Sequence, residues 1–206
     1  MTKKHDIMWL DTVDSTNDEA RRHISDIDNL SVLSALEQTA GRGQRGNRWT
    51  SRPGENLTFS IVLKSPVLMA DDHFALNEIA ALSVTDFLSI YGIKAEIKWP
   101  NDIYVDGRKI CGILIENSFR GKSISTSIIG IGLNINQRNF DVNLPNPTSM
   151  VLCSPTSGSH WCFVGKIMIL IPGTITVISN KVKNLSTSGP VSTYSWTSSP
   201  LTTTVS

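Results

Sequence analysis

Three glycines and three arginines alternate in the segment T-A-G-R-G-Q-R-G-N-R-W, residues 39–49. Glycine tolerates positive φ, so its spacing here predicts an irregular loop whose backbone N–H groups can converge on an anion. Each arginine can bind phosphate or carboxylate through two parallel hydrogen bonds. No Gly-Lys-Ser/Thr follows, so the segment is not a P-loop. The alternative is a solvated hairpin loop whose arginines only aid solubility.

Strand patterns come in runs around this loop, and helical patterns are few and separate from them. An apolar stripe at helical spacing predicts a helix over residues 75–88 that ends at Gly92, and Asp14 or Ser15 can cap a helix that follows it. Asp106-Gly107 predicts a hairpin turn. The pattern is typical of an α+β fold with a mainly antiparallel sheet. The predicted strands are residues 7–10, 31–37, 56–64, 95–99, 103–105, 110–116 and 123–136.

A second candidate site segment is K-W-P-N-D, residues 98–102. Lys98 stands near the end of a predicted buried strand, where its ammonium group could stabilise a developing negative charge. Asn101 and Asp102 follow a proline on a tight turn, where they could meet a ribose or a metal. Taken alone, the segment is equally consistent with an ordinary strand end that carries an exposed lysine.

Glycines also interrupt two predicted strands, at Gly112 and at Gly130 and Gly132. A glycine within a strand often marks a place where a ligand or another backbone approaches closely. A bulge or a packing contact explains each of these glycines singly just as well. Function is therefore indicated by the set rather than by any one of them.

Two polar segments flank the arginine loop in the sequence. Ser15-Thr16-Asn17 stands where a helix begins, and a helix cap is a sufficient explanation for Ser15. Gln38 follows a strand and could both donate to and accept from an amide-like ligand. Taken singly, such a glutamine is more often a surface residue.

Charge and hydropathy exclude several classes of protein. A formal net charge of +1 on 206 residues predicts no strong attraction to nucleic acid or to acidic membranes. The N-terminal residues lack the apolar core of a signal peptide. The longest apolar stretch, residues 167–178, contains Pro172 and is too short to span a bilayer. We therefore expect a cytoplasmic protein.

The three cysteines show no disulfide-like spacing. Cys111 lies within an apolar strand pattern, so we expect a reduced cysteine that packs in the core. His160 between Cys153 and Cys162 offers three ligands at a spacing that matches no familiar zinc site, so we do not expect a metal there.

Four blocks of the sequence together resemble the biotin–protein ligase family. The resemblance covers about residues 5–150 and implies a class II synthetase/biotin–lipoate ligase-like catalytic domain, in which a mainly antiparallel mixed sheet packs against helices. The blocks occur in the family's order and at similar separations: S-T-N, E-Q-T-A-G-R-G-Q-R-G-N-R-W, K-W-P-N-D-I-Y-V-D-G-R-K-I-C-G-I-L-I-E and I-G-I-G-L-N-I-N.

The resemblance implies an ATP-dependent ligase. Biotin's carboxylate would attack the α-phosphate of ATP, with Mg²⁺, and the resulting biotinoyl-AMP would pass its acyl group to a lysine of a biotin carboxyl carrier domain. No DNA-binding helix-turn-helix segment precedes residue 5, so we do not expect a repressor function. Together with the near-neutral net charge, this leads us to expect neither nucleic acid nor membrane as a partner. The chain could be a monomer or a homodimer. The alternatives are a lipoate–protein ligase and a non-catalytic relative that binds biotin.

The resemblance also implies residue roles, while the ligands of the metal stay unknown. The implied catalytic residues are Lys98, Arg42 and Arg45. The implied biotin-binding residues are Ser15, Thr16, Asn17, Gln38, Gly41, Arg42, Trp49, Lys98, Gly112, Leu114, Gly130 and Gly132. The implied nucleotide-binding residues are Arg42, Gly43, Arg45, Gly46, Arg48, Asn101, Lys109 and Asn134.

Residues 151–206 depart from the family pattern. Every Asp and Glu of the chain lies at or before Asp141, and 20 of the last 56 residues are Ser or Thr. The helices and the small C-terminal β domain that the resemblance leads us to expect are not recognisable there. We therefore divide the chain into a biotin- and ATP-binding catalytic domain, 1–150, and an aberrant, acid-free tail, 151–206. We hypothesise that residues from about 151 come from a shifted reading frame or are otherwise non-native in sequence, which resequencing of the gene would test.

Overall fold

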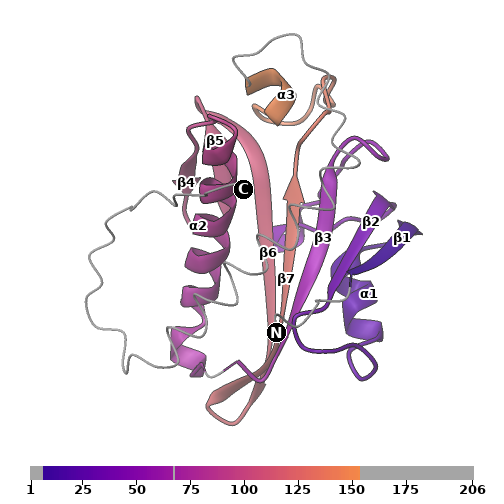
Figure 1. Ribbon diagram of the computed structural model, residues 1–206, viewed down its shortest axis with the longest axis vertical. Helices are drawn as coiled ribbons and strands as arrows, with labels where there is room; N and C mark the ends of the chain where they lie inside the picture. Colours follow the sequence, from indigo (N-terminus) through magenta and orange to yellow (C-terminus); the bar gives the residue numbers. More distant parts are fainter. Residues whose placement is uncertain (1–6, 67, 154–206) are drawn as a thin grey trace, which may run out of the picture.

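The computed structural model describes residues 7–66 and 68–153, which fold into a seven-stranded mixed sheet with two main helices (Figure 1). The strand order is β1-β2-β3-β7-β6-β5-β4. Strands β1 and β2 pair in parallel, and the other described pairings are antiparallel, which confirms the predicted α+β class. The strands are β1 (Ile7–Val13), β2 (Val32–Gln38), β3 (Leu57–Lys64), β4 (Glu96–Lys98), β5 (Asp102–Val105), β6 (Arg108–Arg120) and β7 (Ser123–Leu133).

Several strands are longer than their apolar patterns predict. Strand β1 continues to Val13 because its parallel pairing with β2 runs as far as Val13 and Gln38. Strand β6 continues to Arg120, where a tight turn with Gly121 at φ 62° returns the chain into β7. At these strand ends the backbone hydrogen bonds continue beyond the last buried side chains. Strand β7, in contrast, ends at Leu133, three residues before the predicted end at 136.

The β5–β6 hairpin confirms the turn predicted from Asp106-Gly107. Asp106 has φ 50° and Gly107 has φ 72°, so both central residues adopt the positive φ that a two-residue hairpin turn requires. This turn brings the K-W-P-N-D segment alongside β6. It therefore links the second candidate segment to the glycine-containing strands.

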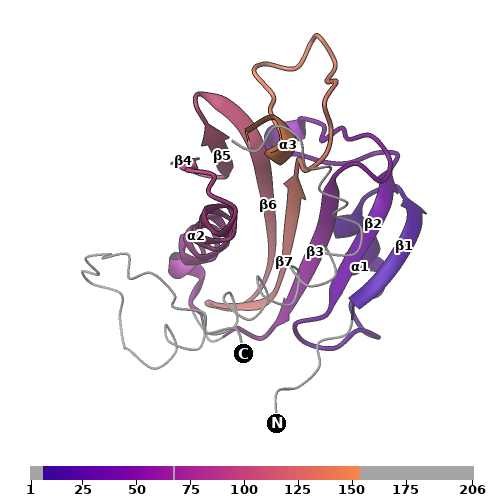
Figure 2. The same cartoon turned by 45° about the horizontal axis from the view of Figure 1, so that its top comes forward.

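Helix α2 (Phe74–Ile90) covers one face of the sheet (Figure 1, Figure 2). It begins one residue before and ends two residues after the predicted span, and Gly92 follows it with φ 71°, as predicted. Its apolar stripe packs on the main hydrophobic core. That core includes Ile61, Ile129 and Ile131, which are at most 3% exposed.

Helix α1 (Thr16–Arg22) lies against the opposite face of the sheet. It shares a small hydrophobic cluster there with strands β2, β3 and β7: Ala20, Ile27, Leu33, Val62 and Ile128. Ser15 occupies the N-cap position, as predicted, but its side chain makes no capping hydrogen bond. Because α1 has only 7 residues, it covers part of this face and leaves the rest of the face for other contacts.

Short helical segments complete the described chain: η1 (Gln44–Gly46), η2 (Ala70–Asp72) and α3 (Met150–Cys153). Helix α3 spans the predicted boundary at residue 150. His160 and Cys162, at which we expected no zinc site, lie outside the described residues, as does the rest of the predicted tail. Within the described ranges, no helix has both the length and the apolar character needed to cross a lipid bilayer.

Candidate functional site

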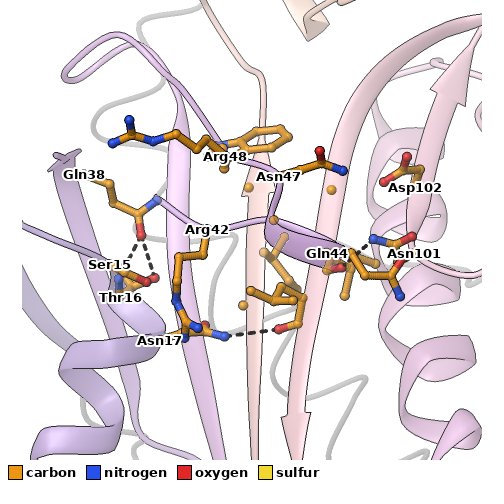
Figure 3. Close-up of a pocket in the computed structure, with 18 of the residues that line it drawn as sticks. Ser15, Thr16, Asn17, Gln38, Arg42, Gln44, Asn47, Arg48, Asn101 and Asp102 are labelled. Carbon is orange, nitrogen blue, oxygen red and sulfur yellow. Dashed lines mark hydrogen bonds between the residues drawn. The ribbon is translucent and has the colours of Figure 1, made fainter. Parts of the chain in front are cut away.

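A cavity of about 130 Å³ opens on the face of the sheet that carries α1. Figure 3 shows Thr16, Asn17, Gln38 and Arg42 on one side of it and Asn101 with Asp102 on the other. The cavity therefore brings together residues from all four sequence blocks. Its lining residues are Ser15, Thr16, Asn17, Gln38, Arg42, Gly43, Gln44, Asn47, Arg48, Trp49, Asn101, Asp102, Lys109, Gly112, Ile113, Leu114, Gly130, Ile131 and Gly132.

Glycines of β6 and β7 form the floor of this cavity. Successive residues of a strand point to opposite faces, so Ile131 packs in the core while Gly130 and Gly132 face the cavity. A Cβ atom at Gly132 would overlap the indole ring of Trp49, and one at Gly130 would overlap the side-chain amide of Asn17. These glycines are therefore required for close packing of the Trp49 and Asn17 side chains, which is the packing alternative that the sequence left open.

A polar wall rises from the N-terminus of α1. The Oε1 atom of Gln38 accepts hydrogen bonds from the backbone N–H of Thr16 at 2.8 Å and from the Thr16 hydroxyl at 3.1 Å (Figure 3). The amide Nδ2 of Asn17 donates to the carbonyl of Leu114 at 3.3 Å and to the Glu116 carboxylate at 2.8 Å. Thr16 and Asn17 are almost fully buried, so their polar groups are fixed beside the cavity.

Arg42 joins the arginine loop to this wall through two carboxylates. Its Nη2 atom lies 2.8 Å from Asp18 on α1 and 2.7 Å from Glu116 on β6, and Arg21 bridges the same two acids. Partial burial raises the pKa of Glu116, but the hydrogen bonds from Asn17 and Arg21 and the charge of Arg42 outweigh it, so the pKa lies below its ordinary value. Glu116 therefore stays ionised between its cationic neighbours.

The arginine loop itself is a small hairpin rather than an open arc. Arg42 and Arg48 form an isolated antiparallel bridge, and the N–H of Gly43 donates to the carbonyl of Asn47 at 2.7 Å. At its tip, Arg45 and Gly46 have φ values of 57° and 80°. These two residues lie outside the cavity lining, while the hairpin stem contributes to it.

Trp49 leaves the hairpin and packs over the glycine floor. Its backbone N–H donates to the Gly41 carbonyl at 3.0 Å, and a Cβ at Gly41 would overlap the carbonyl oxygen of Trp49. The ammonium of Lys109 lies 5.9 Å from the centre of the indole ring. Gly41 therefore acts through backbone packing and does not line the cavity.

The opposite side of the cavity carries a charged pair. Lys109 Nζ lies 2.8 Å from Asp102 Oδ1, and the Asn101 amide donates to the carbonyl of Ile113 at 3.1 Å. Among the residues that line the cavity, Asp102 is the one carboxylate. The lining also carries Arg42, Arg48 and Lys109, so its basic side chains outnumber this carboxylate and favour an anionic ligand.

Besides Gly41, Arg45 and Gly46, two further predicted site residues lie outside the cavity lining. The Lys98 ammonium, at the sheet edge, lies 3.3 Å from the Tyr104 hydroxyl and 4.8 Å from the centre of its ring. Asn134 is 5% exposed, and its amide donates to the carbonyl of Thr148 at 2.9 Å. Asn134 thus holds the end of β7 against the segment that leads into α3.

The sequence interpretation omitted several residues that the fold brings to this site. Gln44 and Asn47 of the arginine loop also line the cavity. The sequence interpretation assigned site roles in this loop to its arginines and glycines and to Trp49, but not to these two residues. Glu116 and Ser60 bond the lining residues from neighbouring strands. Their signal in the sequence was a polar residue within an apolar strand pattern.

The chain matches known proteins across this region. Residues 9–134 match the model of the biotin/lipoate A/B protein ligase family. The chain is 37% identical over 125 residues to the biotin–[acetyl-CoA-carboxylase] ligase of Paracoccus denitrificans, a match that covers 59% of this chain and 51% of that protein. It is also 37% identical over 111 residues to the bifunctional ligase/repressor BirA of Bacillus spizizenii, covering 53% of this chain and 34% of the relative.

A solved structure shares the fold. The biotin protein ligase of Aquifex aeolicus in complex with biotin and ATP superposes with a TM-score of 0.74 at 28% identity, covering 89% of this chain and 72% of that chain. The matched segments of the two curated relatives amount to about half and about a third of their lengths.

Proposed function

Because the chain belongs to the biotin/lipoate A/B protein ligase family, we propose that it activates biotin with ATP and passes the activated acyl group to a carrier protein. The products of the first step are biotinoyl-AMP and pyrophosphate. The observation that carries the proposal is a single cavity in which a polar wall and a cationic hairpin meet over a glycine floor. The relatives named as biotin ligases support the same activity.

The polar wall fits the ring end of biotin. Ser15, Thr16, Asn17 and Gln38 present amide and hydroxyl groups that can bond a cyclic urea. Gly112, Leu114, Gly130 and Gly132 would line the slot for the fused rings once the Trp49 indole, which packs directly on Gly132, moves aside to cover the ligand. Gly41 supports Trp49 from behind through the backbone contact.

The cationic side fits the phosphates. A carboxylate and a triphosphate repel each other, so bringing them within bonding distance requires nearby positive charge. Arg42, Arg45 and Arg48 with Gly43 and Gly46 would close over the phosphate, and Lys98 would stabilise the reacting oxygens. Asn101 and Lys109 would contact the nucleotide. Asn134 would serve the nucleotide side indirectly, through the backbone segment that it fixes.

Mg²⁺ fits the donor set of the same side. The ion prefers oxygen ligands and is commonly held by one or two carboxylates together with substrate phosphates. Asp102 supplies a carboxylate in the cavity lining, where it pairs with the ammonium of Lys109. Bound there with the triphosphate, the ion would neutralise phosphate charge during adenylation.

The mixed anhydride must be kept from water until a carrier lysine arrives. Closure of the arginine hairpin over the cavity would exclude water and retain the intermediate. The proposed acceptor is a lysine of a biotin carboxyl carrier domain. The chain would act as a monomer or a homodimer.

Incubation with ATP, Mg²⁺, biotin and a purified carrier domain tests the proposal, with labelled avidin as the readout. Biotin-dependent exchange of labelled pyrophosphate into ATP tests the first step separately. Exchange without labelling of the carrier would limit the activity to adenylation, and biotin binding without exchange would identify a non-catalytic binder. Faster exchange with lipoate than with biotin would assign the chain to the lipoate branch of the family.

A further inference from the structure

Ser60 is buried behind the polar wall and does not itself line the cavity. It lies in β3 between Phe59 and Ile61, whose side chains pack in the core against α2. Its own side chain therefore points to the opposite face, where α1 begins. Burying a hydroxyl in an apolar strand is unfavourable unless it is hydrogen-bonded, so its partners indicate its role.

The Ser60 hydroxyl contacts two residues of the wall. Its Oγ atom lies 2.8 Å from the Thr16 hydroxyl and 2.6 Å from the side-chain oxygen of Asn17. The Asn17 amide cannot turn over, because its nitrogen donates to the Glu116 carboxylate at 2.8 Å. With Gln38 Oε1, 3.1 Å from the Thr16 hydroxyl, these contacts form a continuous row of four oxygen atoms.

This row contains fewer protons than contacts. Three contacts join the four oxygens, but only the hydroxyls of Ser60 and Thr16 carry a proton, since amide oxygens only accept. Asn17 needs the proton of Ser60, and Ser60 can then accept from Thr16. Gln38 already accepts the backbone N–H of Thr16 at 2.8 Å. The single proton of Thr16 is then used within the row, for Ser60 or for Gln38, so Thr16 presents only lone pairs to a ligand in the cavity.

We propose that Ser60 is a positioning residue that turns Thr16 and Asn17 into fixed hydrogen-bond acceptors, so that the wall is completed by a ligand that donates N–H groups. The inference rests on the proposed function, in which the two ring N–H groups of biotin supply these donors. Ser60 makes no contact with the ligand. It acts by holding the two wall residues in the correct orientation.

Kinetics of four single variants test this role. Ser60→Ala removes the hydroxyl. Ser60→Thr and Ser60→Val introduce side chains of nearly the same shape, but only the Thr variant keeps the hydroxyl. Ser127→Ala is the control, because Ser127 is a fully buried serine of the neighbouring β7 whose hydroxyl has no hydrogen-bond partner within the described residues. Pyrophosphate release is measured with biotin varied at saturating ATP and with ATP varied at saturating biotin.

Loss of the hydroxyl should raise the KM for biotin about 10-fold, as expected when a buried hydrogen-bond partner is removed, and should leave the KM for ATP within about twofold. The Val variant should show the rise relative to the Thr variant, and Ser127→Ala should match the wild type. Equal KM values for biotin in the Val and Thr variants, or equal rises for both substrates, would refute the role of Ser60. A wild type that binds no biotin in calorimetry would instead refute the proposed function.

Discussion

Lys98 and Gly112 lie in one cross-strand row of the sheet, on the same face. Lys98 pairs with Asp102 across β4 and β5, and Asp102 pairs with Gly112 across β5 and β6. Directly opposed residues of antiparallel strands point to the same side. Two strand spacings separate Lys98 from the glycine floor, a distance of about 10 Å. A lysine side chain can span much of that distance once it leaves Tyr104.

Lys98→Ala should therefore slow biotin-dependent pyrophosphate exchange by orders of magnitude, because the reacting oxygens lose a cation. Lys98 is exposed, so the free energy of unfolding should change by no more than about 0.5 kcal/mol. Lys94→Ala, which removes another exposed lysine from the same region, is the matched control. Unchanged exchange in Lys98→Ala would remove this residue from the proposed mechanism.

Gly132→Ala should weaken biotin binding more than Gly112→Ala. The added methyl group at residue 132 overlaps the Trp49 indole, whereas at residue 112 it stands 3.1 Å from the nearest ring carbon, which a small shift of the ring can relieve. We expect calorimetry to give a more than tenfold loss of biotin affinity for Gly132→Ala, equivalent to about 1.4 kcal/mol. Equal losses in the two variants would contradict the packing of Trp49 on this floor.

Arg42→Ala should release the adenylate intermediate. The variant loses a charge-assisted contact with the phosphate, typically about 1.5–3 kcal/mol, so free biotinoyl-AMP should accumulate roughly ten- to a hundredfold faster when no carrier is present. Chromatography of the filtrate measures it. Arg120→Ala, at the exposed β6–β7 hairpin, should behave as the wild type. Retention of the intermediate by Arg42→Ala would argue that other groups close the cavity.

Glu116 should make the free energy of unfolding depend on pH in the acidic range. Its folded-state pKa lies below the ordinary value of 4.5, so its ionised form stabilises the fold above about pH 4.5, and this contribution is lost as the pH falls through the folded-state pKa. The difference in free energy of unfolding between the wild type and Glu116→Gln should be constant above pH 5, roughly, and narrow below it. Urea denaturation at several pH values measures this difference. Glu78→Gln, on the exposed side of α2, should show no such narrowing.

Cys111 should resist alkylation in the folded protein. Complete burial raises the pKa of its thiol well above the ordinary value, and only the thiolate reacts. Iodoacetamide at pH 8, followed by peptide mapping, should label Cys111 only after denaturation and label the half-buried Cys153 sooner. Rapid labelling of Cys111 in the native protein would show that β6 opens readily.

The sequence predicted those elements correctly that depend only on local residues, such as a helix or a turn. The apolar stripe of α2 and the two positive-φ residues of the Asp106-Gly107 turn require no knowledge of distant contacts. The parallel pairing of β1 with β2 was not predicted, because it depends on the crossover through α1, which packs on the face of β2, β3 and β7. Strand ends were also misjudged wherever backbone pairing outlasts the apolar pattern, as at Arg120.

The residues that line the cavity could be predicted where they lie within the four sequence blocks. Fourteen predicted residues line the cavity, while Gly41, Arg45, Gly46, Lys98 and Asn134 do not. The partners of these residues could not be predicted, because Ser60, Asp18 and Glu116 reach the wall from separate elements. Only the fold makes a serine in one strand a neighbour of an asparagine in a helix.

Isoleucine and glycine alternate along β7, so only one register of β7 with β3 and β6 is compatible with the fold. A slip by one position would turn Ile129 and Ile131 into the binding slot and leave holes under α2 in the same step. Misaligned copies would therefore be both unstable and blocked, so selection for folding and selection for ligand binding favour the same arrangement.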